Sequence, residues 1–114
     1  MDQPTNTANP NTAMQADLPI LSLIEWQAPA LTPAEARDVA ERTAVAFRRV
    51  PGLLDFRFFG DFGTGRHFYL QVWADQAALD AYAASESMFR IREIAAPFVS
   101  GRPSRELFAD YTPG

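Results

Sequence analysis

The sequence predicts an α+β domain in which two helical segments cover one face of a four-stranded antiparallel sheet. Segments that alternate at period two flank segments with helical spacing, in the order strand, helix, strand, strand, helix, strand. A short glycine-rich connection, Gly63-Thr64-Gly65, joins the two middle strands as a hairpin. The chain has 114 residues, which is enough for one domain and makes a second domain unlikely on size alone.

The first 17 residues are expected to form a flexible tail. They are rich in Asn, Thr, Gln, Ala and Pro, and they contain almost no large apolar side chain. Such a segment cannot bury enough apolar surface to offset the entropy cost of ordering. The folded domain is therefore expected to span residues 18–112.

The first half of the domain is predicted to be a strand followed by a helix. Residues 18–27, LPILSLIEWQ, are rich in Leu and Ile and alternate as a strand does. Thr32 and Glu35 have the spacing of a capping box, and Pro33 occupies the first helical position, where its missing N–H costs nothing. The Pro-Gly pair at residues 51–52 ends this helix.

The second half is predicted to contain a hairpin, a helix with a break, and a closing strand. Residues 53–62 and 66–73 alternate at period two on either side of the glycine-rich turn. Asp75 is a candidate N-cap for the second helix, which continues after a break at residues 85–87. Residues 104–111, SRELFADY, alternate again. This order is the ferredoxin-like βαββαβ arrangement, with both helices on one face of the sheet.

The other face of this sheet has no helix in the chain to cover it. We assign to that face alternate side chains of the two hairpin strands, namely Asp55, Arg57, Phe59, His67, Tyr69, Gln71 and Trp73. The set is rich in aromatic residues and poor in lysine, which is typical of a protein interface. A second copy of the chain would cover the face with two-fold symmetry, so a homodimer through the open sheet face is expected.

Composition argues against several classes of function. The net charge is −4 and the arginines are dispersed, so nucleic acid is not an expected partner. The chain has no Cys and one His, too few ligands for a typical zinc or non-heme iron site. No apolar run reaches the ~20 residues of a membrane span, so no membrane association is expected. No export signal is visible, and the cytoplasm is the expected location.

Three short patterns point to a family. They are Pro51-Gly52-Leu53, the Val72-Trp73 strand end followed by residues 78–82 (ALDAY), and the Ala84-Ser85-Glu86 step into the later helix. With this order of elements, the chain resembles the antibiotic biosynthesis monooxygenase domain of the dimeric α+β barrel superfamily. The resemblance covers about residues 18–112. It implies a ferredoxin-like fold that pairs into a dimeric barrel.

The resemblance also carries expectations about chemistry. That family includes cofactor-free oxygenases of phenolic or quinol-like substrates, heme-degrading enzymes, and proteins without known activity. The heme-degrading branch pairs an aromatic residue with an iron-ligating His ten residues later, and these positions match Tyr82 and Arg92. A guanidinium has no lone pair for a metal, so heme degradation and a heme cofactor are not expected. Trp73 matches a strand Trp of the cofactor-free branch, which can carry an Asn where this chain has Tyr69.

Seven side chains are candidates for a site. His67 could accept a proton from an acidic phenol or enol, leaving a carbanion that reacts with O2; it could equally be a solvated residue at the sheet edge. Trp73, Tyr69 and Gln71 could form an aromatic wall for a flat ligand, or only the dimer interface. The candidates are His67, Tyr69 and Trp73 as catalytic residues and Arg57, Gln71, Tyr82 and Arg92 as substrate-binding residues.

Two hypotheses for function remain open at this point. In the first, the chain is a homodimeric, cofactor-independent monooxygenase of a small aromatic or quinol-like compound, with Tyr82 shaping the pocket and Arg92 or Arg57 steadying negative charge. No cofactor and no metal are expected. In the second, the same fold serves as a non-catalytic module that binds a small ligand or completes an assembly, and Tyr82 and Arg92 are structural.

Overall fold

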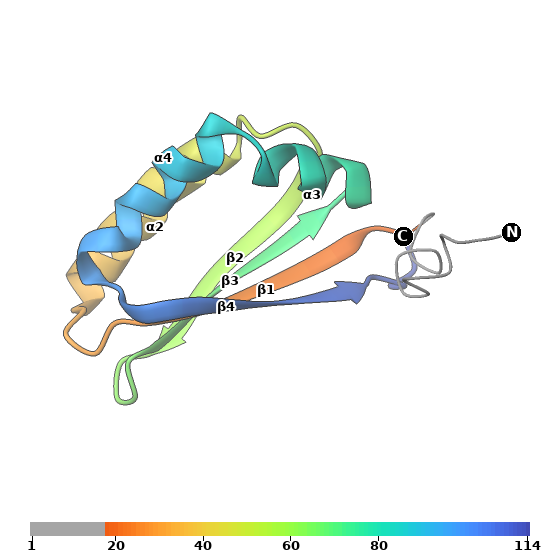
Figure 1. Cartoon of the computed structure of the whole chain (residues 1–114). Coiled ribbons are helices and arrows are strands. Elements are labelled where there is room, and N and C mark those ends of the chain that lie inside the picture. Colours follow the sequence, from red (N-terminus) through yellow and green to blue (C-terminus); the bar gives the residue numbers. More distant parts are fainter. Residues whose placement is uncertain (1–17) are drawn as a thin grey trace, which may run out of the picture.

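The computed structural model describes residues 18–114 as a four-stranded antiparallel sheet with helices against one of its faces (Figure 1). The elements in chain order are β1 (Ile20–Gln27), α2 (Pro33–Phe47), β2 (Leu53–Asp61), β3 (Arg66–Trp73), α3 (Gln76–Ala83), α4 (Glu86–Ala95), the 3-10 helix η2 (Ala96–Phe98) and β4 (Ser100–Ala109). The strand order is β2-β3-β1-β4. The predicted α+β class and ferredoxin-like order of elements are confirmed. The predicted tail at residues 1–17 lies outside the described residues.

The start of α2 is fixed by the predicted capping box. The Glu35 backbone N–H donates to the Thr32 hydroxyl over 3.2 Å, and the Thr32 N–H donates to the Glu35 carboxylate over 2.9 Å. Two N–H groups that the helix itself leaves unpaired are thereby satisfied. One face of the helix buries Val39, Thr43 and Phe47, and this face is directed at the sheet.

The hairpin between β2 and β3 depends on a glycine. Gly65 has a φ of 76°, in the left-handed region, and its N–H donates to the Asp61 carbonyl over 2.8 Å. A Cβ at this position would lie 2.8 Å from the Cα of Pro29. The Ala28 N–H also donates to the Gly65 carbonyl over 2.8 Å. Glycine is therefore required both by the turn and by the close approach of the loop after β1.

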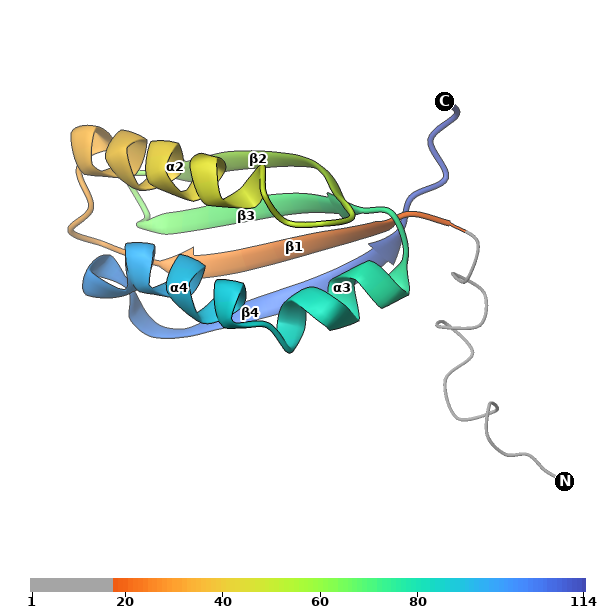
Figure 2. The same cartoon turned by 90° about the horizontal axis from the view of Figure 1, so that it is seen from above.

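The second helical segment is two short helices, because Ser85 begins a new one. The Ser85 hydroxyl accepts a hydrogen bond from the Met88 N–H over 3.3 Å, as an N-cap does. The predicted break is thus confirmed. Leu79 and Tyr82 of α3 are buried, whereas Ala83 is exposed. Viewed from above, α2 lies over β2 and β3, while α3 and α4 lie nearer β4 (Figure 2).

The closing strand is longer than its sequence indicates. It begins at Ser100 and ends at Ala109, although the prediction was residues 104–111. Gly101 has a φ of 76°, and the pairing of β4 with β1 shifts register between Glu25 and Gln27, so the strand continues through an irregularity. Pro103 is tolerated because β4 is an edge strand and no neighbour on its outer side needs its N–H.

The face assigned to β3 was wrong. Its side chains His67, Tyr69, Gln71 and Trp73 lie beneath the helices. Phe47 of α2 meets the Tyr69 ring edge-on at 6.0 Å, which fixes the orientation of the strand. Both faces of β3 are rich in apolar side chains, so period two alone could not decide which one the helices would cover. In β2, by contrast, Asp55, Arg57 and Phe59 do lie on the uncovered face, opposite Val72, Leu70 and Phe68.

The helix-covered face holds two buried clusters. One gathers around Phe47, Trp73 and Leu79, and the other around Trp26 and Val39. Within residues 18–114, no helix has the length and apolar character needed to cross a membrane.

Candidate functional site

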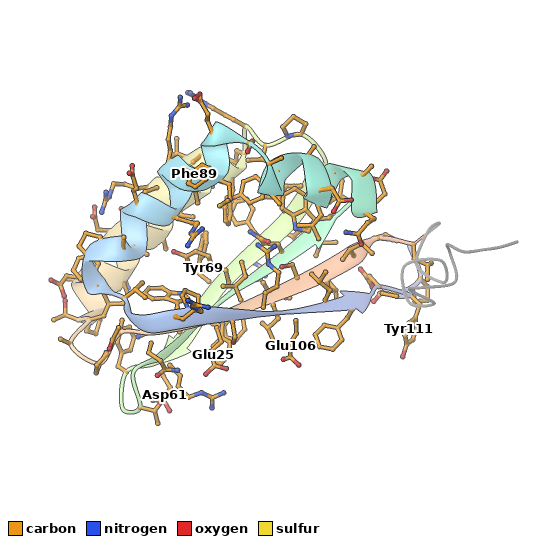
Figure 3. The ribbon with its side chains drawn as sticks, in the orientation of Figure 1. Glu25, Asp61, Tyr69, Phe89, Glu106 and Tyr111 are labelled. Carbon is orange, nitrogen blue, oxygen red and sulfur yellow. The ribbon has the colours of Figure 1, made fainter. Side chains whose placement is uncertain are left out.

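A cavity of about 930 Å³ lies between the sheet and the helices α3 and α4. This volume is near the upper end of the ~300–1,000 Å³ range of small-molecule sites. The sheet contributes Ile24, Trp26, Tyr69 and Gln71 to its lining. Figure 3 shows Tyr69 rising from the sheet into the space beneath the helices. The helices and β4 complete the lining with Tyr82, Met88, Phe89, Arg92, Glu93, Arg102 and Arg105, among others.

The walls are largely aromatic. Trp26 and Tyr69 pack edge-to-face with ring centroids 5.6 Å apart, and Phe47 packs against the other side of Tyr69. All three rings line the cavity. Rigid aromatic walls of this kind suit a flat apolar ligand, because they offer large contact area with little loss of side-chain entropy.

Gln71 brings hydrogen-bond donors to the sheet side of the cavity. The Trp73 indole N–H donates to the Gln71 carboxamide oxygen over 3.1 Å, and both side chains are buried. The two residues lie on one face of β3 because side chains two apart share a face. Since the oxygen is engaged by Trp73, the amide N–H groups of Gln71 are the ones left for a ligand.

Tyr82 is a neutral hydroxyl at the helix side of the cavity. Its ring packs against Trp73 at 5.1 Å. Burial raises the pKa of Tyr82 to about 12, although the positive charges of Arg105 and Arg92 counteract part of this increase. At neutral pH the group is therefore protonated and can donate a hydrogen bond to an oxyanion.

Other polar atoms of the cavity wall are buried without a partner. The Tyr69 hydroxyl and the Trp26 indole N–H make no hydrogen bond within the described residues. Burial raises the pKa of Tyr69, and the nearby Thr43 hydroxyl offsets part of this effect although the two groups do not reach ordinary hydrogen-bond geometry. Unsatisfied buried groups are uncommon in folded proteins, so these two groups are available to hydrogen-bond a ligand in the cavity.

Three arginines line the cavity from α4 and β4. Arg105 pairs with Ile24 of β1 in register, so its side chain lies on the helix-covered face. Burial lowers the pKa of Arg105; the Tyr82 hydroxyl opposes this shift, and the charge of Arg92 adds to it. Arg102 is the third arginine, and Glu93 is the carboxylate among the lining residues. Within residues 18–114, no His, Asp and Glu side chains form a cluster of three that could hold a metal ion.

Four of the seven predicted site residues come together here. Tyr69, Gln71, Tyr82 and Arg92 line the cavity, whereas His67, Trp73 and Arg57 do not. Trp73 is buried behind Gln71 and Tyr82. Arg57 projects from the uncovered face of the sheet, opposite Leu70.

His67 is buried near the hairpin end of β3 and is not solvated at the sheet edge. It is 4% exposed and packs against Trp26 and Phe62 at ring distances of 5.1 and 5.2 Å. Burial lowers the pKa of His67, and the charge of Asp61 partly opposes this. The imidazole therefore contacts Trp26, which lines the cavity, without lining the cavity itself.

Sequence reasoning missed Trp26 and Arg105 as site residues. A signal for Arg105 was present, because it alternates with Leu107 and Ala109 in the closing strand and so shares their face. An arginine on the inner face of a strand is unusual and marks a candidate binding residue. Trp26 was recognised as a strand residue, but its place beside Tyr69 depends on the pairing of β1 with β3.

Comparison with known proteins identifies the fold. No protein-family model matches the sequence, and no curated protein matches it. SnoaB, a cofactor-independent oxygenase from Streptomyces nogalater, is similar in structure with a TM-score of 0.68 and 18% identity, covering 84% of this chain and 96% of SnoaB. A candidate antibiotic biosynthesis monooxygenase from Caulobacter crescentus gives a TM-score of 0.71 at 17% identity, covering 88% and 96%.

A further candidate monooxygenase, from Bordetella bronchiseptica, gives a TM-score of 0.72 at 10% identity and covers 83% of this chain and 99% of its own. The chain thus has the fold of an antibiotic biosynthesis monooxygenase domain, as the resemblance in its sequence implied.

Proposed function

We propose that the chain is a cofactor-independent monooxygenase that oxidises a small phenolic or quinol-like compound in the cavity. The observation that supports this is an aromatic-walled cavity into which Gln71, Tyr82 and Arg105 bring hydrogen-bond donors. The fold is shared with SnoaB, which is a cofactor-independent oxygenase.

The donors suit a substrate that reacts as an anion. A cation within ~4–6 Å lowers the pKa of a bound acid, so Arg105 and Arg92 would favour the phenolate or enolate form. The neutral Tyr82 hydroxyl and the Gln71 amide would donate to the same oxygen. His67 does not line the cavity, and the substrate proton in this proposal leaves to water and not to the imidazole.

The reaction balances without a cofactor. The keto tautomer of a phenol carries two hydrogens on a ring carbon, and loss of one as a proton gives a carbanion that passes electrons to O2. A C–O bond forms, the second oxygen takes up a proton, and the hydroperoxide loses water to leave a carbonyl. One oxygen atom enters the product and the other leaves as water, with all four electrons supplied by the substrate.

Oxygen consumption tests this proposal. Protein freed of metal and flavin is mixed with hydroquinones or naphthalenediols, and the rate of oxygen uptake is compared with that of the same compounds without protein. With isotopically labelled O2, one labelled oxygen atom should appear in the product. We expect Arg105→Gln and Tyr82→Phe to lower the rate at least about tenfold, as loss of one oxyanion donor does. Arg90→Gln, a variant of an exposed α4 residue outside the cavity lining, should keep the rate. Binding without oxygen uptake would instead identify the non-catalytic ligand-binding module.

We also propose that a second copy of the chain covers the uncovered face of the sheet. Phe59 and Phe68 stack on this face at 5.0 Å, and Phe59 is 49% exposed. Leu23, Leu70 and Val72 extend the apolar surface. Aromatic and aliphatic side chains on a sheet face that no helix covers are typical of an interface, and a two-fold dimer is the commonest way to cover such a face.

A further inference from the structure

The side of the cavity formed by α4 and β4 is locally cationic in a chain whose net charge is −4. Three arginines, Arg92, Arg102 and Arg105, line it together with one carboxylate, Glu93. A single phenolate oxygen does not require so many positive charges. The excess suggests that the natural ligand carries a negative charge of its own.

Arg92 and Arg105 have no acidic partner within residues 18–114. The ion pairs of the described chain engage Arg42, Arg66 and Arg90. The hydrogen bond of Arg92 runs to the Met88 sulfur over 3.8 Å, and a thioether is only a weak acceptor. Each guanidinium therefore keeps most of its planar fork of donors for a ligand.

Arg92 and Arg105 also line the same cavity. The charge of Arg92 helps to lower the pKa of Arg105, and the charges of both arginines counteract the rise in the pKa of Tyr82. Like charges that line one cavity repel, so an anion bound there would relieve the repulsion. The arrangement comes from three separate elements, α3, α4 and β4, which converge on one side of the cavity.

We propose that Arg105 and Arg92 form an anion-binding subsite and that the substrate is an aromatic carboxylate. The inference rests on the proposed function for the use of this cavity. A carboxylate is matched by the planar fork of a guanidinium, which can donate two parallel hydrogen bonds to it. The aromatic part of the ligand would lie against Trp26 and Tyr69, and the carboxylate would turn toward β4.

The test is a comparison of two probes of nearly equal shape, 2-naphthoate and 2-naphthamide, by titration calorimetry on the full chain. We expect the carboxylate to bind at least about tenfold more tightly than the amide, since charge-assisted hydrogen bonds are about twice as strong as neutral ones. In Arg105→Gln and Arg92→Gln the preference should fall to about twofold or less. In Arg90→Gln the preference for the carboxylate should remain, because Arg90 lies on α4 with Arg92 but does not line the cavity.

Equal binding of the two probes by the unsubstituted chain would overturn the inference, as would a preference that survives in both cavity variants. The NMR resonances of the backbone amides supply a second readout that does not depend on affinity. Addition of 2-naphthoate should shift the resonances of residues 92 and 105. Shifts confined to other parts of the chain would also overturn the inference. Neither probe has a hydroxyl to oxidise, so the result is independent of turnover. Absence of oxygen uptake together with a retained carboxylate preference would overturn the oxygenase proposal alone.

Discussion

The indole N–H of Trp73 donates to the carboxamide oxygen of Gln71 over 3.1 Å inside the protein, where these side chains are 0% and 1% exposed. This hydrogen bond links a core residue to a residue of the cavity wall, because Trp73 packs against Tyr82 in the core and Gln71 lines the cavity. A buried amide oxygen that lost its donor would have no water to replace it. The hydrogen bond from Trp73 therefore fixes the orientation of the Gln71 amide.

Trp73→Phe is expected to lower the free energy of unfolding by about 2–4 kcal/mol, from the lost packing and from the unpaired Gln71 oxygen. Urea unfolding measures this. The double variant Trp73→Phe, Gln71→Leu should be less destabilised than the sum of the single variants by about 1 kcal/mol, because it removes both partners of the bond. Additive effects would mean that the bond contributes nothing.

The raised pKa of Tyr82 predicts that the fold loses stability in alkaline solution. Its pKa is raised from 10.0 to about 12 in the folded chain, so its contribution is fully present below pH 10 and is lost as the pH rises through about 12. Tyr82→Phe should weaken this pH dependence, leaving the smaller part from Tyr69, whose pKa burial also raises. Unfolding measured between pH 10 and pH 12 checks the difference, and identical curves would contradict it.

Arg105→Gln should raise the pKa of Tyr82 further, because the charge of Arg105 favours the tyrosinate. Titration of the tyrosinate absorbance follows this shift. Arg90→Gln serves as the control, because Arg90 does not line the cavity and its loss should leave the pKa of Tyr82 unchanged.

His67→Phe is expected to leave oxygen uptake within about twofold of the unsubstituted chain, because the imidazole does not line the cavity. Stability should change in a pH-dependent way instead. Burial holds the pKa of His67 below 6.5, so its neutral form stabilises the fold above pH 6.5 and this contribution is lost as the pH falls through the lowered pKa. The variant should lack this acid-dependent loss. A large fall in uptake with the fold intact would restore His67 as the base.

Phe59→Glu should separate the proposed dimer into single chains, because it places a charge beside Phe68 on the uncovered face. Sedimentation at micromolar concentration measures the change. Val45→Glu is the matched control, since Val45 is 54% exposed but lies on α2, away from that face. A Phe59→Glu variant that still sediments as a dimer would place the interface elsewhere.

Local signals accounted for most of the fold. The capping box of Thr32 and Glu35, the hairpin glycine Gly65 and the break at Ser85 each act through hydrogen bonds or backbone angles within a few residues. Such features can be recognised from neighbouring residue types alone. The start of β4 could not, because Gly101 and Pro103 indicate a turn unless the pairing with β1 is known.

The lining of the cavity could be predicted only in part, for a related reason. The chemistry of Tyr69, Gln71, Tyr82 and Arg92 marks them as candidates in the sequence, and the fold brings them to one cavity. Alternation places Arg105 on one face with Leu107 and Ala109, but its position at the cavity depends on the long-range pairing of β4 with β1.

The sequence alone determined the order of the strands and helices, because periodicity and capping are local properties of the chain. The tertiary structure decided which face of β3 the helices cover. Phe68, Leu70 and Val72 are the more apolar set, whereas His67, Tyr69, Gln71 and Trp73 combine two large aromatic rings with polar groups, so alternation alone does not decide which set the helices cover. Packing of Phe47 against Tyr69 and of Tyr82 against Trp73 selected the second set. As a result Tyr69 and Gln71, which we expected at a dimer interface, line the cavity, and Trp73 packs behind Gln71.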